Sequence, residues 1–247
     1  MKHFPLRRLV VPGLLILLLT GTFATPTGRA VWKPGPPVTT VARFNFDGAG
    51  NAAWSDISGH GHTLTPVTGG QATVIRESHA GGQAVRFPPR CKRGRPCPRM
   101  VLRAAGTPAL NPGARPFRYG AAIRLAPNRT SKGQNLLQKG FSAEGSQYKL
   151  QIDGRSGHPS CALVAGKAIH LALAKLSVAD DRWHTLECRR AGTSLSVLID
   201  GVTQGSAVVP AGLSISNGRP LSIGGKSAYG DNDQYHGLLD DVWIAVG

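Results

Sequence analysis

The sequence predicts an all-β protein whose two antiparallel sheets pack face to face as a jelly-roll β-sandwich. Residues 180–201 show two runs of period-two alternation separated by a turn, which is the signature of a β-hairpin with one buried face. The 247 residues include 32 glycines and 18 prolines, as a chain of many short strands and turns requires. Strands do not alternate with amphipathic helices, so an α/β fold is excluded.

The predicted hairpin is the centre of this fold. Its first arm, residues 183–190, places His184, Leu186 and Cys188 on one face. In its second arm, apolar Leu195, Val197 and Ile199 alternate with residues 196, 198 and 200. Asp200-Gly201 then predicts a second turn and a third strand. Such a three-strand meander is not stable alone and needs a second sheet to cover it.

The remaining strands follow from shorter apolar runs. A second hairpin is predicted from residues 136–140 and 147–153, and residues 51–70 are expected to form a loop. The other expected strands are residues 41–47, 73–75, 84–87, 101–103, 117–125, 161–164, 169–178, 213–215, 221–223 and 238–246.

The first 30 residues have the pattern of a signal peptide. A positive segment with Lys2, Arg7 and Arg8 precedes an apolar run over residues 10–19, which is too short to span a bilayer. Small residues near positions 24 and 30 fit a cleavage site, and an uncleaved anchor is the alternative. We therefore expect a secreted, extracellular protein with no stable membrane span after cleavage. Its Pro-rich residues 31–40 would be a linker and residues 41–247 one domain.

All four cysteines lie after this leader, as an oxidising compartment favours. Three pairings are possible. We favour Cys91–Cys97, which closes a tight loop, and Cys161–Cys188, which ties the hairpin's first arm to the strand before it. A zinc site is the alternative, but these spacings differ from those of zinc fingers.

Three motifs resemble one known family. The order D-x-x-W-H-x-L from Asp180, followed by L-x-V-x-I-D-G ending at Gly201, is similar to the centre of laminin-G-like domains in the concanavalin A-like lectin and glucanase superfamily. GLLDDVWIAV, residues 237–246, resembles their closing strand, and residues 44–64 resemble their opening strand and following loop. The resemblance implies the same jelly roll, although this fold carries many unrelated functions.

Carboxylates suited to catalysis are not arranged in a known pattern. Glycosidases of this superfamily carry E-x-D-x-x-E, whereas Glu77, Glu144 and Glu187 are far apart here. The adjacent pairs Asp180–Asp181 and Asp240–Asp241 should point to opposite faces of a strand. We therefore predict that the protein is not an enzyme.

A calcium site is expected on a loop near the C-terminus. Asp231, Asn232 and Asp233 offer side-chain oxygens of the kind that Ca²⁺ prefers. The family resemblance adds Asp240 on the closing strand, and Asp47 would lie on the neighbouring first strand. The alternatives are turn chemistry for the loop and an ion pair for Asp240. His60 and His62 have no evident third metal ligand, so we expect them to pack in their loop.

Two kinds of residue are candidates for ligand binding. Lys92, Arg93 and Arg95 lie in the Cys91–Cys97 loop, where they would attract anionic polymers, unless the loop is only a solvated basic surface. Specific nucleic-acid binding is disfavoured because no aromatic residues interleave with these cations. Carbohydrate stacking would need exposed aromatic rings, for which the candidates are Trp54, Tyr229 and Tyr235.

These observations predict a secreted, non-catalytic module that binds carbohydrate or an anionic cell-envelope polymer outside the cell. A protein–protein adhesion module, with a surface protein as partner, is the alternative. A polysaccharide hydrolase is the third choice.

Overall fold

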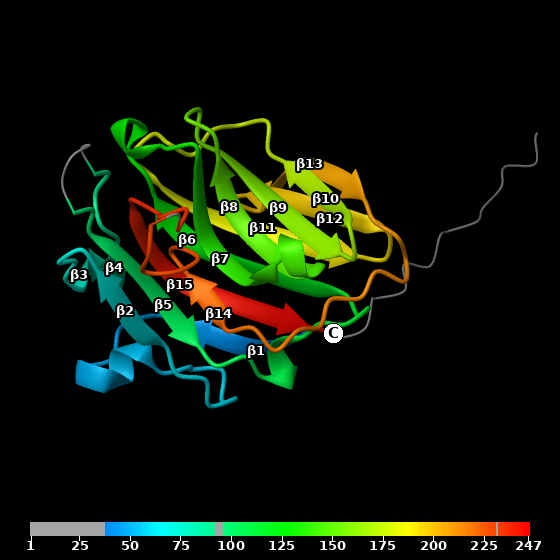
Figure 1. Ribbon diagram of the computed structural model, residues 1–247, viewed down its shortest axis with the longest axis horizontal. Coiled ribbons are helices and arrows are strands. Elements are labelled where there is room, and N and C mark those ends of the chain that lie inside the picture. Colours follow the sequence, from blue (N-terminus) through cyan, green and yellow to red (C-terminus); the bar gives the residue numbers. More distant parts are fainter. Residues whose placement is uncertain (1–37, 92–95, 231) are drawn as a thin grey trace, which may run out of the picture. The chain divides into compact units, whose positions relative to one another are not determined.

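The computed structural model describes residues 38–91, 96–230 and 232–247. The predicted signal peptide lies outside these residues, as does the predicted linker except for residues 38–40. The described chain contains β-strands and short 3-10 turns, and its strands form two antiparallel sheets, which confirms the predicted fold class. Figure 1 shows the two sheets stacked on each other. No helix in this part of the chain is long and apolar enough to cross a membrane.

The larger sheet has eight strands in the order β13-β12-β11-β6-β15-β4-β3, with β1 also paired to β15. Its strands are β1 (Thr39–Phe44), β3 (Ile75–His79), β4 (Gly82–Arg86), β6 (Phe117–Arg124), β11 (Trp183–Ala191), β12 (Ser194–Ile199), β13 (Val202–Val208) and β15 (Leu238–Val246). The other sheet has seven strands in the order β10-β9-β8-β7-β14-β5-β2. They are β2 (Thr65–Gly69), β5 (Arg99–Ala104), β7 (Gly133–Phe141), β8 (Ser146–Asp153), β9 (His158–Ala165), β10 (Ala168–Leu173) and β14 (Leu221–Ile223).

The predicted central hairpin is present as β11 and β12, and β13 completes the meander. Leu186, Cys188, Leu195 and Val197 are fully buried on its inner face. Burying an apolar side chain of this size stabilises the fold by about 1.5–3 kcal/mol. Asp200 and Gly201 have φ angles of 51° and 79°, so they form the tight turn that their sequence predicts.

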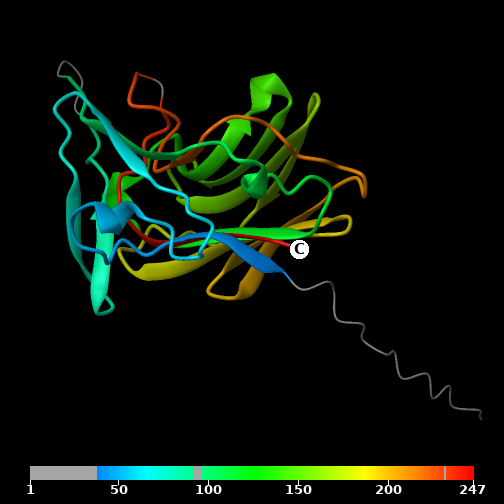
Figure 2. The same cartoon turned by 90° about the horizontal axis from the view of Figure 1, so that it is seen from below.

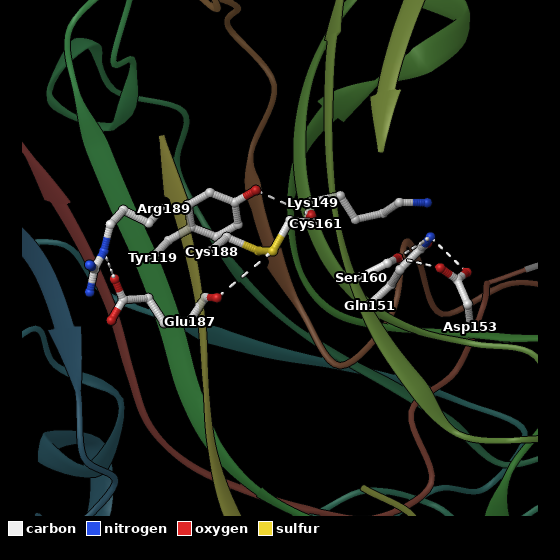
Figure 3. The surroundings of a disulfide bond; sticks show 9 residues. All are labelled: Tyr119, Lys149, Gln151, Asp153, Ser160, Cys161, Glu187, Cys188 and Arg189. Carbon is white, nitrogen blue, oxygen red and sulfur yellow. Dashed lines mark hydrogen bonds and ion pairs between the residues drawn. A yellow bond between two sulfur atoms is a disulfide. The ribbon is translucent and has the colours of Figure 1, made fainter. Parts of the chain in front are cut away.

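Both predicted disulfides are present, joining Cys91 to Cys97 and Cys161 to Cys188. The second differs in one respect from the prediction, because the partner strand is β9 in the facing sheet and β10 intervenes along the chain. It therefore joins the two layers through the core (Figure 3). Beside it, the buried Tyr119 donates a hydrogen bond to the carbonyl of Lys149 across the same interface, at 3.2 Å.

Several strand boundaries differ from those predicted. The expected loop over residues 51–70 contains the 3-10 turn Gly50–Trp54 and strand β2. β2 includes Pro66 and lies at a sheet edge, where the missing N–H costs no ladder hydrogen bond. The first strand ends at Phe44, because Phe46 takes a φ of 58°. Residues 213–215 form a single bridge to Gly113 rather than a strand.

The hairpin of β3 and β4 turns away from the rest of its sheet. β15 pairs with β4 only at Leu238 and Leu239, and its register against β6 is irregular between Asp240 and Trp243. Figure 2 shows β3 and β4 standing steeply beside the other strands. The hairpin thereby carries Arg86 and the chain that follows it to one end of the sandwich.

Candidate functional site

Four loops meet at this end of the sandwich and surround a cleft of about 370 Å³, here called the first cleft. They are the β4–β5 loop with the Cys91–Cys97 disulfide, the β6–β7 loop, the β8–β9 turn and the β14–β15 loop (Figure 1). The charged and ionisable residues that line it are Arg90, Arg99, Lys132, Arg155, Asp233 and His236. Both cysteines of the short disulfide also line it, so this crosslink holds part of the wall.

A second cleft, of about 310 Å³, shares His236 with the first. Its walls come from β4, the end of β6 with the residues after it, and the start of β15. Its charged residues are Arg86, Arg124, Arg129 and Asp181. Because His236 lines both clefts, the two hollows adjoin through this one side chain.

The cations of the first cleft differ from most other arginines in having no anionic partner. Elsewhere, Arg43, Arg118 and Arg219 bind Asp241, Glu187 and Glu144, and Arg182 and Arg189 are paired as well. Of the described cations that line the two clefts, five have side chains without an ion pair or hydrogen bond: Arg90, Arg99, Arg129, Lys132 and Arg155. The acids nearby are already neutralised, since Asp233 pairs with Lys226 at 2.9 Å and Asp181 with Arg124 at 2.9 Å. The two clefts therefore carry an uncompensated positive charge.

His236 is held firmly between the clefts. Its Nδ1 lies 2.8 Å from the carbonyl oxygen of Pro88, and its backbone N–H donates to Oε1 of Gln134 at 2.9 Å. Burial lowers the pKa of His236, the bond to Pro88 opposes this, and the charges of Arg90 and Arg129 lower it further. The imidazole therefore favours its neutral form.

The β14–β15 loop is shaped by buried amides. Oε1 of Gln234 accepts from the backbone N–H of Met100 at 2.8 Å and from Nδ2 of Asn232 at 3.0 Å. Asn232 also donates to the carbonyl of Ser227 at 2.9 Å. These bonds fix the loop so that Tyr229 protrudes with 81% of its surface exposed, next to Gly230 on the cleft wall.

The other two aromatic candidates are not exposed platforms. Tyr235, predicted as a ligand-binding residue, is fully buried, and its hydroxyl lies within hydrogen-bond distance of the carbonyls of Arg124 and Leu238. That prediction is wrong, because the ring fills the core beneath the loop, against Phe87. Trp54 is partly buried against Phe46, with ring centroids 6.1 Å apart. Only Tyr229 of the three is placed as a stacking surface requires.

The basic loop residues Lys92, Arg93 and Arg95 lie outside the described residues, as does Asp231. The remaining calcium candidates all contact other protein groups: Asp47 accepts from Asn45 and Gln83, and Asp240 accepts from Nδ1 of His79 at 2.7 Å. Burial raises the pKa of Asp240, although the hydrogen bond from His79 opposes this. Asn232 and Asp233 take part in the bonds given above. Among the described residues, no group of three or more His, Cys, Asp or Glu side chains is arranged to hold a metal ion.

The acidic residues form ion pairs that keep them apart. Glu77 binds Arg86, Glu144 binds Arg219, and Glu187 binds Arg118 and Arg189. The members of each adjacent aspartate pair contact different partners: Asp180 contacts His184 while Asp181 contacts Arg124, and Asp240 contacts His79 while Asp241 contacts Arg43. The strand alternation that we expected is not the cause, because Asp180 and Asp181 precede β11 and because Asp181 and Asp241 have φ angles of 62° and 42°. In the SGHGH loop, His62 is buried and Nδ1 of His60 contacts Ser58 Oγ at 3.1 Å.

Sequence reasoning missed Arg129, Lys132, Arg155 and His236, because these residues come from three separate loops. No local motif joins them. The available signal was weak: Arg129 and Lys132 stand between two predicted strands with no acidic residue within four positions of either.

Comparison with known proteins relates this architecture to a known superfamily. A family model described as the concanavalin A-like lectin/glucanases superfamily matches residues 119–245, about half of the chain. No curated protein matches at the level of sequence.

Several solved structures share the fold at low sequence identity. Domain 4 of AbnA, a GH43 extracellular arabinanase from Geobacillus stearothermophilus solved in complex with arabinotriose, has a TM-score of 0.64 and 14% identity, with 85% of this chain and 93% of that chain covered. The binding domain of Paraclostridial Mosquitocidal Protein 1 has a TM-score of 0.63 and 14% identity, with 83% and 48% covered. The binding domain of botulinum neurotoxin DC in complex with SialylT has a TM-score of 0.60 and 9% identity, with 83% and 47% covered. The chain thus spans about half the length of the two toxin domains. By its family match and its sandwich of two antiparallel sheets, the chain belongs to the concanavalin A-like lectin/glucanases superfamily.

Proposed function

We propose that this protein is an exported, non-catalytic module that binds an anionic glycan or a related anionic polymer in the first and second clefts. The observation that carries the proposal is the convergence of Arg90, Arg99, Arg129, Lys132 and Arg155, unpaired within the described chain, on one end of the sandwich. Unpaired cations that share a concave surface raise the local concentration of anionic ligands and select them over neutral ones.

The side chains that line the two clefts favour an acidic sugar as ligand. Guanidinium groups bind carboxylate or phosphate oxygens through two parallel hydrogen bonds. Tyr229, exposed beside the first cleft, offers a ring on which a sugar face can stack. Two structural neighbours, an arabinanase domain in complex with arabinotriose and a toxin binding domain in complex with SialylT, support a glycan as the ligand.

Three further features support an exported protein without catalysis. Two disulfides suit an oxidising compartment, and the N-terminal sequence has the pattern of a signal peptide. Glycoside hydrolysis needs two carboxyl groups flanking the scissile bond. The described carboxylates that line the clefts, Asp181 and Asp233, are each ion-paired and lie in different clefts.

A protein ligand is the second candidate, supported by a different surface. Strand β10 exposes Ile169, Leu171 and Leu173, with 62%, 45% and 48% of their surfaces accessible. Alternation places these side chains on one face of an edge strand, and such apolar patches mark contact surfaces.

The glycan proposal is tested by binding measurements on paired variants. We expect oligogalacturonate, a carboxylate-bearing glycan, to bind the wild-type protein and to bind Arg155→Glu at least tenfold more weakly. Lys167→Glu, which reverses an exposed charge in the β9–β10 turn, is the matched control and should keep wild-type affinity. Binding should also weaken as salt increases. Equal affinities of Arg155→Glu and the wild type would reject the first cleft as part of the binding site.

A further inference from the structure

The two clefts meet at a histidine whose tautomer is fixed by the fold. The carbonyl oxygen of Pro88, 2.8 Å from Nδ1 of His236, can only accept a hydrogen bond, so Nδ1 carries the proton. In the neutral ring, Nε2 then holds a lone pair. Nε2 has no hydrogen-bond partner within the described chain. It therefore remains available to a ligand at the point where the hollows adjoin.

We propose that one linear anionic chain lies across both clefts as a single groove, and that His236 donates a hydrogen bond from Nε2 to an anionic group of this chain. The inference rests on the proposed function and specifies its ligand as a polymer with repeated carboxylate or phosphate groups. Cations flank His236 on both sides, with Arg90 in the first cleft and Arg129 in the second. A chain that follows them must pass the histidine.

This contact couples ligand binding to protonation of His236. In the empty groove, burial and the charges of Arg90 and Arg129 keep the pKa of His236 low, so the ring is neutral. The two nearby acids do not offset this, because Asp181 is paired with Arg124 and Asp233 with Lys226. An anion in the groove compensates the arginines and accepts a hydrogen bond from Nε2 after this nitrogen has taken up a proton from solvent. Binding then favours protonation, and by reciprocity protonation favours binding.

The chain contains a matched control for this residue. His158 contacts the carbonyl of Ala174 through Nδ1 at 2.9 Å, the same kind of bond that His236 makes to Pro88. His158 lines neither cleft. His236→Gln and His158→Gln both keep an amide that can donate to the carbonyl, and both remove the titratable ring.

The test measures affinity and proton uptake by calorimetry from pH 5 to pH 8, with oligogalacturonates of one, three and six residues and with a six-phosphate polyphosphate. We expect the wild type to bind the six-residue chain about tenfold more tightly at pH 5 than at pH 8 and to take up a proton. His236→Gln should lose both effects, and His158→Gln should keep them. Arg129→Gln and Arg155→Gln, one in each cleft, should each weaken binding of the six-residue chain. Binding of the single sugar should be weakened by at most one of these substitutions.

Contrary results separate the two proposals. The single groove is rejected, and the proposed function kept, if salt-dependent binding shows the same pH dependence in the wild type and His236→Gln. The same conclusion follows if only one of Arg129→Gln and Arg155→Gln weakens binding of the six-residue chain. Failure of every oligogalacturonate and of polyphosphate to bind at any pH overturns both. If His236→Gln does not fold, the absence of proton uptake by the wild type on binding decides against the inference.

Discussion

Nδ1 of His184 lies 2.8 Å from Oδ2 of Asp200, so the first arm of the central hairpin is bonded to the turn that ends its second arm. The other ring nitrogen, Nε2, contacts Asp180 at 3.1 Å. Asp200 also accepts the backbone N–H of Thr185 at 2.8 Å. The residues of the D-x-x-W-H motif and the later D-G turn thus meet in one cluster that closes the hairpin end.

Replacing this histidine should destabilise the fold. His184→Ala removes two charge-assisted hydrogen bonds, so we expect the free energy of unfolding to fall by about 1–3 kcal/mol, measured in urea. His60→Ala, at an exposed loop position, should change it by less than about 0.5 kcal/mol. Equal losses in the two variants would contradict a role of the cluster in holding the hairpin.

The lowered pKa of Asp180 predicts a loss of folding stability in acid. Burial alone would raise the pKa of Asp180, but hydrogen bonds from Arg182 and His184 lower it to about 2. A carboxyl group with a lowered pKa in the folded state stabilises above its unfolded pKa and loses this contribution as the pH falls through the folded one. Stability should therefore decrease between about pH 4 and pH 2, and Asp180→Asn should show a smaller decrease in urea unfolding.

The lowered pKa of Lys139 predicts a gain of stability in alkali. This fully buried lysine donates to Oδ1 of Asn111 and to Asn217, yet burial lowers its pKa to about 8. Above pH 8 the folded state releases a proton that the unfolded state still binds, so folding becomes more favourable as the pH rises. Between pH 8 and 9.5, the wild type should gain about 1.5 kcal/mol relative to Lys139→Met. Parallel curves for the two proteins would show that Lys139 is not titrating.

The two disulfides should have separable effects. Cys161→Ala/Cys188→Ala opens the crosslink between the sheets and should cost about 3–4 kcal/mol of unfolding free energy, with ligand affinity unchanged in the folded protein. Cys91→Ala/Cys97→Ala opens a shorter loop and should cost about 2 kcal/mol, but it should weaken oligogalacturonate binding because both cysteines line the first cleft. Unchanged binding by the second variant would show that the loop does not shape the site.

Calcium binding remains a prediction from the sequence. If Asp231 and Asp233 bind Ca²⁺, adding about 1 mM calcium should raise the melting temperature of the wild type, because a ligand that binds only the folded state stabilises it. Asp231→Asn/Asp233→Asn should abolish the increase, and Asp47→Asn serves to test the second set of ligands. No increase in the wild type would reject calcium as a cofactor.

Much of the fold was determined by local sequence patterns. The alternation of Leu195, Val197 and Ile199 specifies a strand with one buried face wherever that strand is placed. Asp200-Gly201 specifies its turn by backbone preference alone. The predicted sandwich and both cysteine pairings followed from features of this kind.

The candidate site was decided only by the tertiary structure. Arg90, Arg129, Arg155 and His236 come from separate loops, and their approach depends on how two sheets bring those loops to one end. The same holds for Tyr235, whose sequence neighbours suggest a loop while its ring fills the core. Whether a cation is free or paired depends on acids far away in the sequence, as Arg43 and Asp241 show across 198 positions. Local sequence patterns determine backbone conformation, whereas charge compensation depends on residues that come together only when the chain folds.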